Sequence, residues 1–198
     1  MIAKFLVTKM IEELLKYDTE LFLFLNNLGS ESWDEFWRVV TEKWSSIPLY
    51  VILLYVIYKK LGTKGTIIVL VCAALLVTAT DQLASLFKYN IMRPRPCRLE
   101  SLQDNMRFVA DGCGRFGYFS AHATSSMGVA VFLGLLLKPF YKYAPFLLLF
   151  WAVLLGYSRI YLGVHYPLDV ITGMFFGGLL GLPCYKVQEW AQNRFNSS

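Results

Sequence analysis

Residues 65–80 read GTIIVLVCAALLVTAT, and this stretch decides the fold class because it runs for 16 residues without a charge. Ordinary strands have about 3 to 10 residues, so the length of the run predicts a helix. A helix needs roughly 20 mostly apolar residues to cross a bilayer, and residues flanking the run supply the remainder. The sequence therefore predicts a transmembrane helix here.

Four more runs of the same kind lie on both sides of this one. They are Trp44–Tyr58, Phe116–Leu137, Tyr143–Ser158 and Val170–Tyr185. Several runs reach bilayer length only if the ionisable residues Lys88, Arg159 and Asp169 at their ends belong to the helices. We therefore predict an all-α, polytopic membrane helix bundle with five spans. A sixth span near residues 11–28 is the alternative.

The composition of the whole chain agrees with a membrane protein. Of its 198 residues, 56% are hydrophobic and 17% are charged, the mean hydropathy is +0.47, and the formal net charge is +5. A chain of this length holds one domain, which excludes an enzyme with a second substrate-binding domain. Disordered and nucleic-acid-binding proteins are also excluded, because neither concentrates its apolar residues in membrane-length runs.

The first 43 residues differ from the rest because charges punctuate their apolar positions. A spanning helix there is unfavourable, since each ion at the centre of a membrane helix costs about 2.5 to 3.5 kcal/mol. We predict that residues 1–43 form interfacial amphipathic helices and that residues 44–198 form the transmembrane core. Met10, Trp33 and Trp37 would then face acyl chains. A helix packed on the bundle is the alternative.

Alternation of the five spans places segments 88–120 and 159–169 at one face of the membrane. The basic residues between the other spans predict that the opposite face is cytoplasmic, but segment 88–115 also holds six basic residues, so charge alone leaves the orientation open. Most of the unusual polar residues gather at the face of 88–120. Ionisable residues at membrane depth are expensive and indicate a functional site.

Three motifs lie at that face in chain order: Lys88 with six residues before Arg95-Pro96, then Phe119-Ser120-Ala121-His122, then Ser158-Arg159 with five residues before His165. Together they resemble the three-part signature of the type 2 phosphatidic acid phosphatases, the membrane branch of the lipid phosphate phosphatase and haloperoxidase superfamily. Arg93-Pro94 lies two residues too early to match the first part. The second part departs from the family's Pro-Ser-Gly-His at Phe119 and Ala121. The resemblance covers residues 45–190.

A phosphate monoester carries close to two negative charges, so its binding and transfer depend on cations and N–H donors. Lys88, Arg95 and Arg159 are predicted to bind the phosphate, the arginines by a planar fork and the lysine as a point charge. Ser120 is predicted to cap the helix that it opens. The backbone N–H groups beside it, at Ala121, then face the phosphate at the positive end of the helix dipole.

Asp169 follows His165 by four residues, so one helical turn brings its carboxylate beside the imidazole and fixes the tautomer. His165 is then the predicted nucleophile, giving a phosphohistidine, as the resemblance also implies. His122 is predicted to protonate the leaving oxygen and later to take a proton from water. We expect no metal and no other cofactor, because three cations take the place of a metal. Asp81 is predicted to be a structural partner inside the bundle.

Cys97 and Cys113 lie in the loop between the first two motifs. If that face is extracytoplasmic, they are predicted to form a disulfide, which would stabilise the fold by about 3 kcal/mol. Cys72 and Cys184 fall inside predicted spans and are expected to be inert apolar residues.

The sequence therefore predicts a membrane phosphatase acting on a lipid phosphomonoester or diphosphate. Phosphatidic acid, phosphatidylglycerol phosphate, a polyprenyl diphosphate and lipid A are the candidate substrates. A lipid phosphotransferase with the same site is the alternative, and a non-catalytic transporter is a weaker one. We expect a multi-pass protein of a bacterial inner membrane with its active site on the extracytoplasmic face. Its partner would be a membrane lipid phosphate, with no nucleic acid and no metal.

Overall fold

The structure, a computed structural model, describes residues 2–196 of the chain and the side chains of residues 6–42 and 44–195. The described residues form α-helices (α) and short 3₁₀-helices (η). In chain order they are α1 (Ile2–Asn27), α2 (Glu31–Thr41), η1 (Lys43–Ser46), α3 (Ile47–Ile91), η2 (Pro96–Arg98), α4 (Glu100–Gln103), α5 (Ala121–Leu137), α6 (Ala144–Tyr161) and α7 (Pro167–Asn196). The described residues contain no strand, only an isolated bridge between Pro94 and Phe116. The all-α prediction is confirmed.

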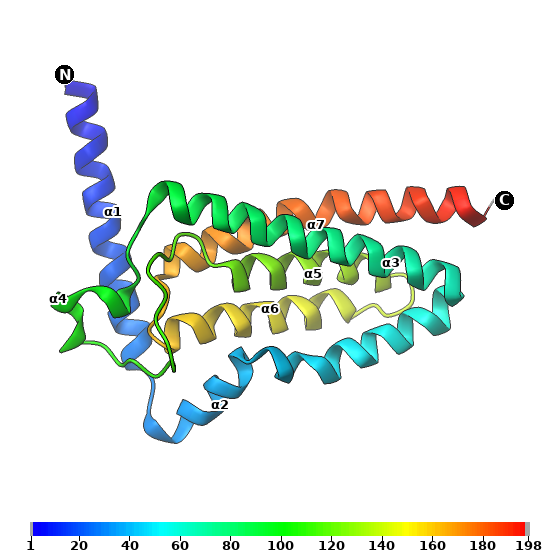
Figure 1. Cartoon of the computed structure of the whole chain (residues 1–198), viewed down its shortest axis with the longest axis horizontal. Coiled ribbons are helices and arrows are strands. Elements are labelled where there is room, and N and C mark those ends of the chain that lie inside the picture. The colour runs from blue at the N-terminus through cyan, green and yellow to red at the C-terminus, as the bar shows by residue number, and fades with distance from the viewer. Residues whose placement is uncertain (1, 197–198) are drawn as a thin grey trace.

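Helix α3 consists of two segments that turn back on each other at Gly62 (Figure 1). Gly62 has φ 66° and ψ −173°, a conformation that glycine adopts without the steric cost of a Cβ. The two segments correspond to the runs Trp44–Tyr58 and 65–80 that the sequence singled out. The sequence thus located both helices correctly, and a single glycine reverses the chain between them.

Three helical segments of the described residues are long and apolar enough to cross a membrane, and the protein is a membrane protein. They are Trp44–Ile91, which includes both segments of α3, then Ala144–Tyr161 and Pro167–Phe195. Helix α5 is equally apolar but has only 17 residues. The count of five spans stays a prediction.

The predicted span Phe116–Leu137 is wrong at its beginning, because α5 starts only at Ala121. Residues 116–120 form a loop instead, and the Gly117 N–H in this loop donates to the Arg93 carbonyl at 2.9 Å. At other ends the helices extend beyond the predicted runs, since α3 continues to Ile91 and α7 extends from Pro167 to Asn196. Lys88, Arg159 and Asp169 do belong to α3, α6 and α7, as the length of the runs required.

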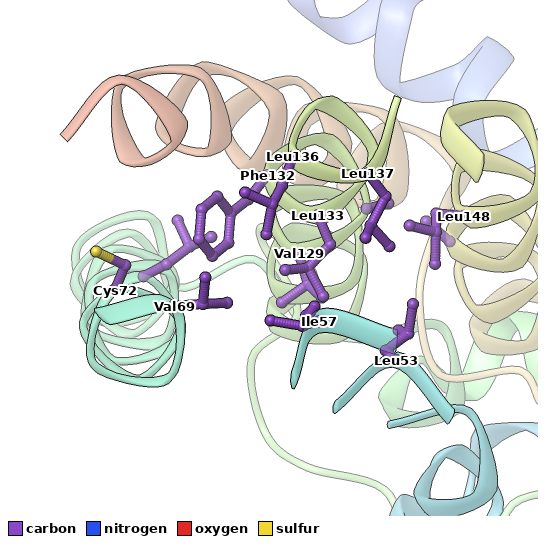
Figure 2. Packing of buried hydrophobic residues seen from close by; sticks show 13 residues of the cluster. Leu53, Ile57, Val69, Cys72, Val129, Phe132, Leu133, Leu136, Leu137 and Leu148 are labelled. Carbon is purple, nitrogen blue, oxygen red and sulfur yellow. The ribbon is translucent and has the colours of Figure 1, made fainter. Parts of the chain in front are cut away.

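Helix α5 lies at the centre of the bundle, with both segments of α3, α6 and α7 around it (Figures 1 and 2). Phe132 and Leu133 of α5 are buried with Ile57 and Val69 of the two α3 segments in one apolar cluster. On the α7 side the backbones approach closely, since a Cβ at Gly181 would lie 2.6 Å from the Gly128 carbonyl oxygen. This packing fixes the ends of α5 and α7, where the second and third motifs lie.

Helix α1 leaves the end of the bundle at a steep angle (Figure 1). Its last turns bury Asp18, Phe22 and Asn26, which lie on one helical face at intervals of four residues, whereas residues 6–17 are exposed. The alternative of a helix packed on the bundle therefore holds for the end of α1. An interfacial position for residues 6–17 stays a prediction, as does the division into residues 1–43 and 44–198, whose outermost residues lie outside the described ones.

Helix α2 partly contradicts the prediction that its aromatic residues face lipid. Trp33 and Phe36 are exposed, but Trp37 stacks on Tyr161 with ring centroids 5.3 Å apart and meets Tyr157 edge-on at 5.0 Å. Stacking on α6 buries aromatic area that the sequence pattern assigned to acyl chains. Trp37 thus anchors α2 over α6.

Candidate active site

The three motifs meet at one cavity with a volume of about 460 Å³. Its lining residues come from the end of α2, the segment that joins α2 to α3, helices α3, α5 and α6, and the loops after α3 and α6. They are Thr41, Glu42, Ser46, Tyr50, Val77, Asp81, Lys88, Arg95, Ala121, His122, Ser125, Ser126, Val129, Leu155, Arg159 and His165. The structure therefore brings together all three predicted cations and both histidines.

Two of the cations are held by hydrogen bonds that leave part of each guanidinium facing the cavity. Arg95 donates from Nε to the Phe116 carbonyl at 3.0 Å, and Arg159 donates from Nη1 to the Thr41 hydroxyl at 2.5 Å. The Nε of Arg159 is buried and has no hydrogen-bond partner among the described residues. A buried N–H group without a partner is costly to the folded state.

The second motif forms the N-terminus of α5 as predicted. Ser120 is the N-cap, its hydroxyl accepting from the Ala123 N–H at 3.4 Å, and Ala121 is the first helical residue and lines the cavity. Phe119, which replaces the family's proline, is fully buried and packs on Phe87 and Phe176 with ring centroids 5.1 Å away in both cases. The departure from the motif thus serves packing below the cap.

His165 and Asp169 form a buried pair at the N-terminus of α7. The Nδ1 of His165 lies 3.4 Å from Oδ2 of Asp169, and the same oxygen accepts the Tyr166 N–H at 3.1 Å. His165 itself lies in the loop before Pro167, not in the helix. Burial lowers the pKa of His165 to about 4, with smaller contributions from Arg95 and Arg159, while Asp169 raises it. The imidazole is therefore neutral near pH 7, as a nucleophile must be.

Two carboxylates also face the cavity. Asp81, expected to be a partner inside the bundle, lines the cavity together with Lys88, and Glu42 does so from the segment after α2. The sequence placed Asp81 on the Lys88 face of the helix but did not predict that this face borders the site. Glu42 had no sequence signal, because it lies outside all three motifs.

Sequence reasoning also missed three residues around the His165–Asp169 pair. Arg93 donates from Nη1 to Asp169 Oδ1 at 2.8 Å and from Nη2 to Asp18 Oδ2 at 2.6 Å. A Cβ at Gly117 would lie 3.1 Å from Asp169 Oδ2, so any side chain there would crowd the carboxylate. The sequence signal for Arg93 was that it belongs to a second Arg-Pro pair, Arg93-Pro94, next to Arg95-Pro96. Arg93 was not predicted to be a site residue because this pair does not match the spacing of the motif.

Cys97 and Cys113 form a disulfide across the loop between α3 and α5, as predicted. Cys72 is buried in α3, and Cys184 in α7 donates to its carbonyl at 3.5 Å. Arg98 also ties this loop by donating to the Cys113 carbonyl at 2.5 Å. The loop that carries Arg93 and Arg95 is thus closed by a covalent link.

The fold and the cavity define a class, namely helical membrane proteins with a cationic, histidine-containing site at the ends of their apolar helices. Residues 46–193 match the family model described as the PAP2 superfamily, and the chain belongs to this family. The resemblance found in the three motifs is confirmed, and with it the assignment to a family of phosphatases.

Two relatives resemble almost the whole chain. A lipid A 4'-phosphatase of Bacteroides thetaiotaomicron is 34% identical over 95% of this chain and 84% of its own length. A lipid A 4'-phosphatase of Porphyromonas gingivalis is 30% identical over 93% of this chain and 78% of its own length. These matches include the N-terminal helices, which the family model does not cover.

Two crystal structures share the fold. A PAP2-type phosphatidylglycerolphosphate phosphatase of Bacillus subtilis superimposes with a TM-score of 0.71 at 21% identity, over 89% of this chain and 87% of its own. Aquifex aeolicus LpxE superimposes with a TM-score of 0.65 at 24% identity, over 85% and 94%. At these identities the likeness concerns the fold.

Proposed function

We propose that the protein is a membrane lipid phosphatase that removes a phosphate group by way of a phosphohistidine on His165. The observation that carries the proposal is a single cavity lined by Lys88, Arg95, Arg159 and both histidines. Three cations offset the charge of a phosphate monoester and can donate hydrogen bonds to its oxygens.

An apolar groove next to the cavity supports a lipid substrate. It has a volume of about 490 Å³ and lies between the two segments of α3 and α5. Tyr50, Val77 and Val129 line both the groove and the cavity. An acyl chain in this groove would place its headgroup phosphate beside the cations. Each buried CH₂ contributes about 0.8 kcal/mol, so the groove favours lipids over soluble esters.

The chemistry follows from the positions of the two histidines. Asp169 holds the proton of His165 on Nδ1, so Nε2 carries the lone pair that attacks phosphorus while the bond to the lipid oxygen breaks. His122 gives its proton to that oxygen. Water then attacks the phosphohistidine, His122 takes the proton of the water, and the bond from phosphorus to Nε2 breaks to release phosphate. Lys88, Arg95 and Arg159 stabilise the charge on the equatorial oxygens in both steps.

Lipid A phosphorylated at the 4' position is the first lipid to test, because the two relatives that match nearly the whole chain are named for it. The site residues hold the phosphate without a metal in this mechanism. We place the active site on the extracytoplasmic face, since a disulfide between Cys97 and Cys113 persists where the environment is oxidising.

Phosphate release by the purified protein from lipid A, phosphatidic acid, phosphatidylglycerol phosphate and a polyprenyl diphosphate tests the proposal, with glycerol phosphate as the soluble control. We expect release from a lipid, in the presence of chelator, at a catalytic efficiency well above that for glycerol phosphate. Equal efficiency on glycerol phosphate would contradict the lipid substrate. Transfer to a second lipid without release would identify a phosphotransferase instead.

A further inference from the structure

We infer that Arg93, held by Asp18 of helix α1, is a positioning residue that fixes the Asp169 carboxylate and through it the tautomer and orientation of His165. The expected effects on kcat rest on the proposed function, whereas the expected effect on the His165 tautomer does not. Arg93 belongs to the Arg-Pro pair that the motif spacing leaves unused, and Asp18 lies before residues 46–193, which the family model covers.

The two oxygens of Asp169 have separate partners. Oδ1 accepts from Arg93 Nη1 at 2.8 Å, whereas Oδ2 accepts from the Tyr166 N–H at 3.1 Å and lies 3.4 Å from His165 Nδ1. With Oδ1 bound to Arg93, the carboxylate cannot rotate, and Oδ2 stays directed at the imidazole. An ionised carboxylate only accepts hydrogen bonds, so the His165 proton is held on Nδ1 and Nε2 keeps its lone pair.

Arg93 is itself fixed on three sides. Its Nη2 donates to Asp18 Oδ2 at 2.6 Å, and its guanidinium lies 3.9 Å above the centre of the Tyr166 ring. The exposed fraction of its side chain is 13%, against 5% for Asp18 and 0% for Asp169. A planar guanidinium can bridge two carboxylates and stack on a ring at once, and a lysine ammonium cannot.

Asp18 connects this arrangement to the helix that carries Asp169. Its second oxygen, Oδ1, accepts the Leu168 N–H at 2.8 Å, in the first turn of α7. The end of helix α1 therefore caps α7 and anchors Arg93 with the same carboxylate. Burial raises the pKa of Asp18 above its ordinary value, and the hydrogen bonds from Arg93 and the Leu168 N–H oppose this rise.

Arg93 is not among the residues that line the cavity. Its loss should therefore affect turnover and leave phosphate binding intact. We expect Arg93→Gln to lower kcat about 100-fold with KM and inhibition by inorganic phosphate within about threefold of the wild type. Arg93→Lys should have a kcat about tenfold higher than Arg93→Gln, because lysine restores the charge but cannot bridge Asp18 and Asp169. Asp18→Asn should lower kcat about tenfold, and the double variant Asp18→Asn, Arg93→Gln should be no worse than Arg93→Gln alone.

Two control variants test whether the loss of any arginine from this loop, or of any carboxylate from helix α1, has the same effect. Arg115→Gln removes an exposed arginine of the same loop, and Glu20→Gln removes an exposed carboxylate of the same helix. Both should retain wild-type kcat. Thermal unfolding of each variant in detergent shows whether it is folded, and if Arg93→Gln fails to fold, Arg93→Lys and Asp18→Asn supply the kinetic test.

The decisive measurement does not need activity, because the chain has only two histidines. Nitrogen-15 NMR of histidine-labelled protein, with His122→Gln to assign the signals, should show His165 as one neutral tautomer protonated at Nδ1. Arg93→Gln should give a mixture of tautomers, and the two controls should not. An unchanged His165 tautomer in folded Arg93→Gln or Asp18→Asn would overturn the positioning role. An inactive wild type would contradict the proposed function and leave the tautomer test in force.

Discussion

The helix bundle of residues 47–196 and the N-terminal helices α1 and α2 contribute to the site in different ways. The bundle provides the histidines and cations that would touch phosphate, from motifs with fixed spacing. The N-terminal helices provide side chains that hold arginines of the bundle, such as Asp18 on Arg93 and Thr41 on Arg159. The groups proposed to act on phosphate thus lie in the bundle, whereas part of their support comes from the N-terminal helices, and changes in the two regions should fail in different ways.

The largest effect is expected in the bundle, from His165→Ala. Without a nucleophile, phosphate release should fall by about 10⁵-fold or more, while the protein stays folded because Asp169 keeps its hydrogen bonds from Arg93 and the Tyr166 N–H. Phosphate release by purified protein and thermal unfolding in detergent measure the two quantities. Wild-type release by a folded His165→Ala protein would contradict the nucleophile.

Asp169→Asn should reduce turnover less, by about 10³-fold, because the imidazole survives but loses the partner that fixes its tautomer. The asparagine can still accept from Arg93, so the fold should be kept. Initial rates with a saturating lipid phosphate measure kcat. A loss as complete as that of His165→Ala would show that Asp169 does more than orient the ring.

Removal of the disulfide tests how much the loop between α3 and α5 contributes to stability. Cys97→Ser with Cys113→Ser should lower the free energy of unfolding by about 3 kcal/mol, since the link closes a loop between residues 16 apart. Thermal unfolding with and without reductant measures it. Cys72→Ser should leave the sensitivity to reductant as in the wild type, and a double variant as stable as the oxidised protein would argue against the constraint.

Asn26→Ala tests the contribution of helix α1 to the stability of the bundle. The Asn26 amide is fully buried, donates to the carbonyls of Arg107, Ile160 and Tyr161, and accepts the Arg107 N–H at 2.7 Å. Its loss should cost about 2 kcal/mol of unfolding free energy, because these groups are left without partners. The remaining folded protein should turn over normally.

Asn27→Ala is the matched control for this prediction. Asn27 is exposed and donates to the Asn105 carbonyl, so its replacement should change stability by less than about 0.5 kcal/mol. If Asn26→Ala abolished turnover in a stable protein, the N-terminal helices would contribute to chemistry and not only to support.

The smallest effect is the pH dependence of stability that His165 imposes. Its pKa falls from 6.5 to about 4 on folding, chiefly through burial. Between these values the unfolded chain binds a proton that the folded protein does not, so this contribution is fully present above pH 6.5 and is lost as the pH falls towards 4. His165→Gln should make the melting temperature less dependent on pH between 6.5 and 5. An equal slope in variant and wild type would contradict the buried neutral imidazole.

Part of the site was predictable because it is local in the sequence. Ser120 caps the helix that it opens and Asp169 follows His165 by four residues, so sequence spacing alone brings these groups close. The apolar runs likewise determined the helices, since a membrane-length segment without charge has few other ways to satisfy its backbone. The length of the apolar runs also predicted that the ionisable residues at their ends belong to the helices.

Only the tertiary structure decided which distant residues support that site. Arg93 meets Asp18 and Asp169 across 75 and 76 residues, and Arg159 meets Thr41 across 118. Such partners have no fixed spacing, and an isolated Asp or Thr in an amphipathic helix gives no sign of what it contacts. Trp37 and the beginning of α5 were mispredicted for the same reason. Periodicity describes one element at a time, whereas burial, and the pairing of charges that burial requires, arises only where elements pack together.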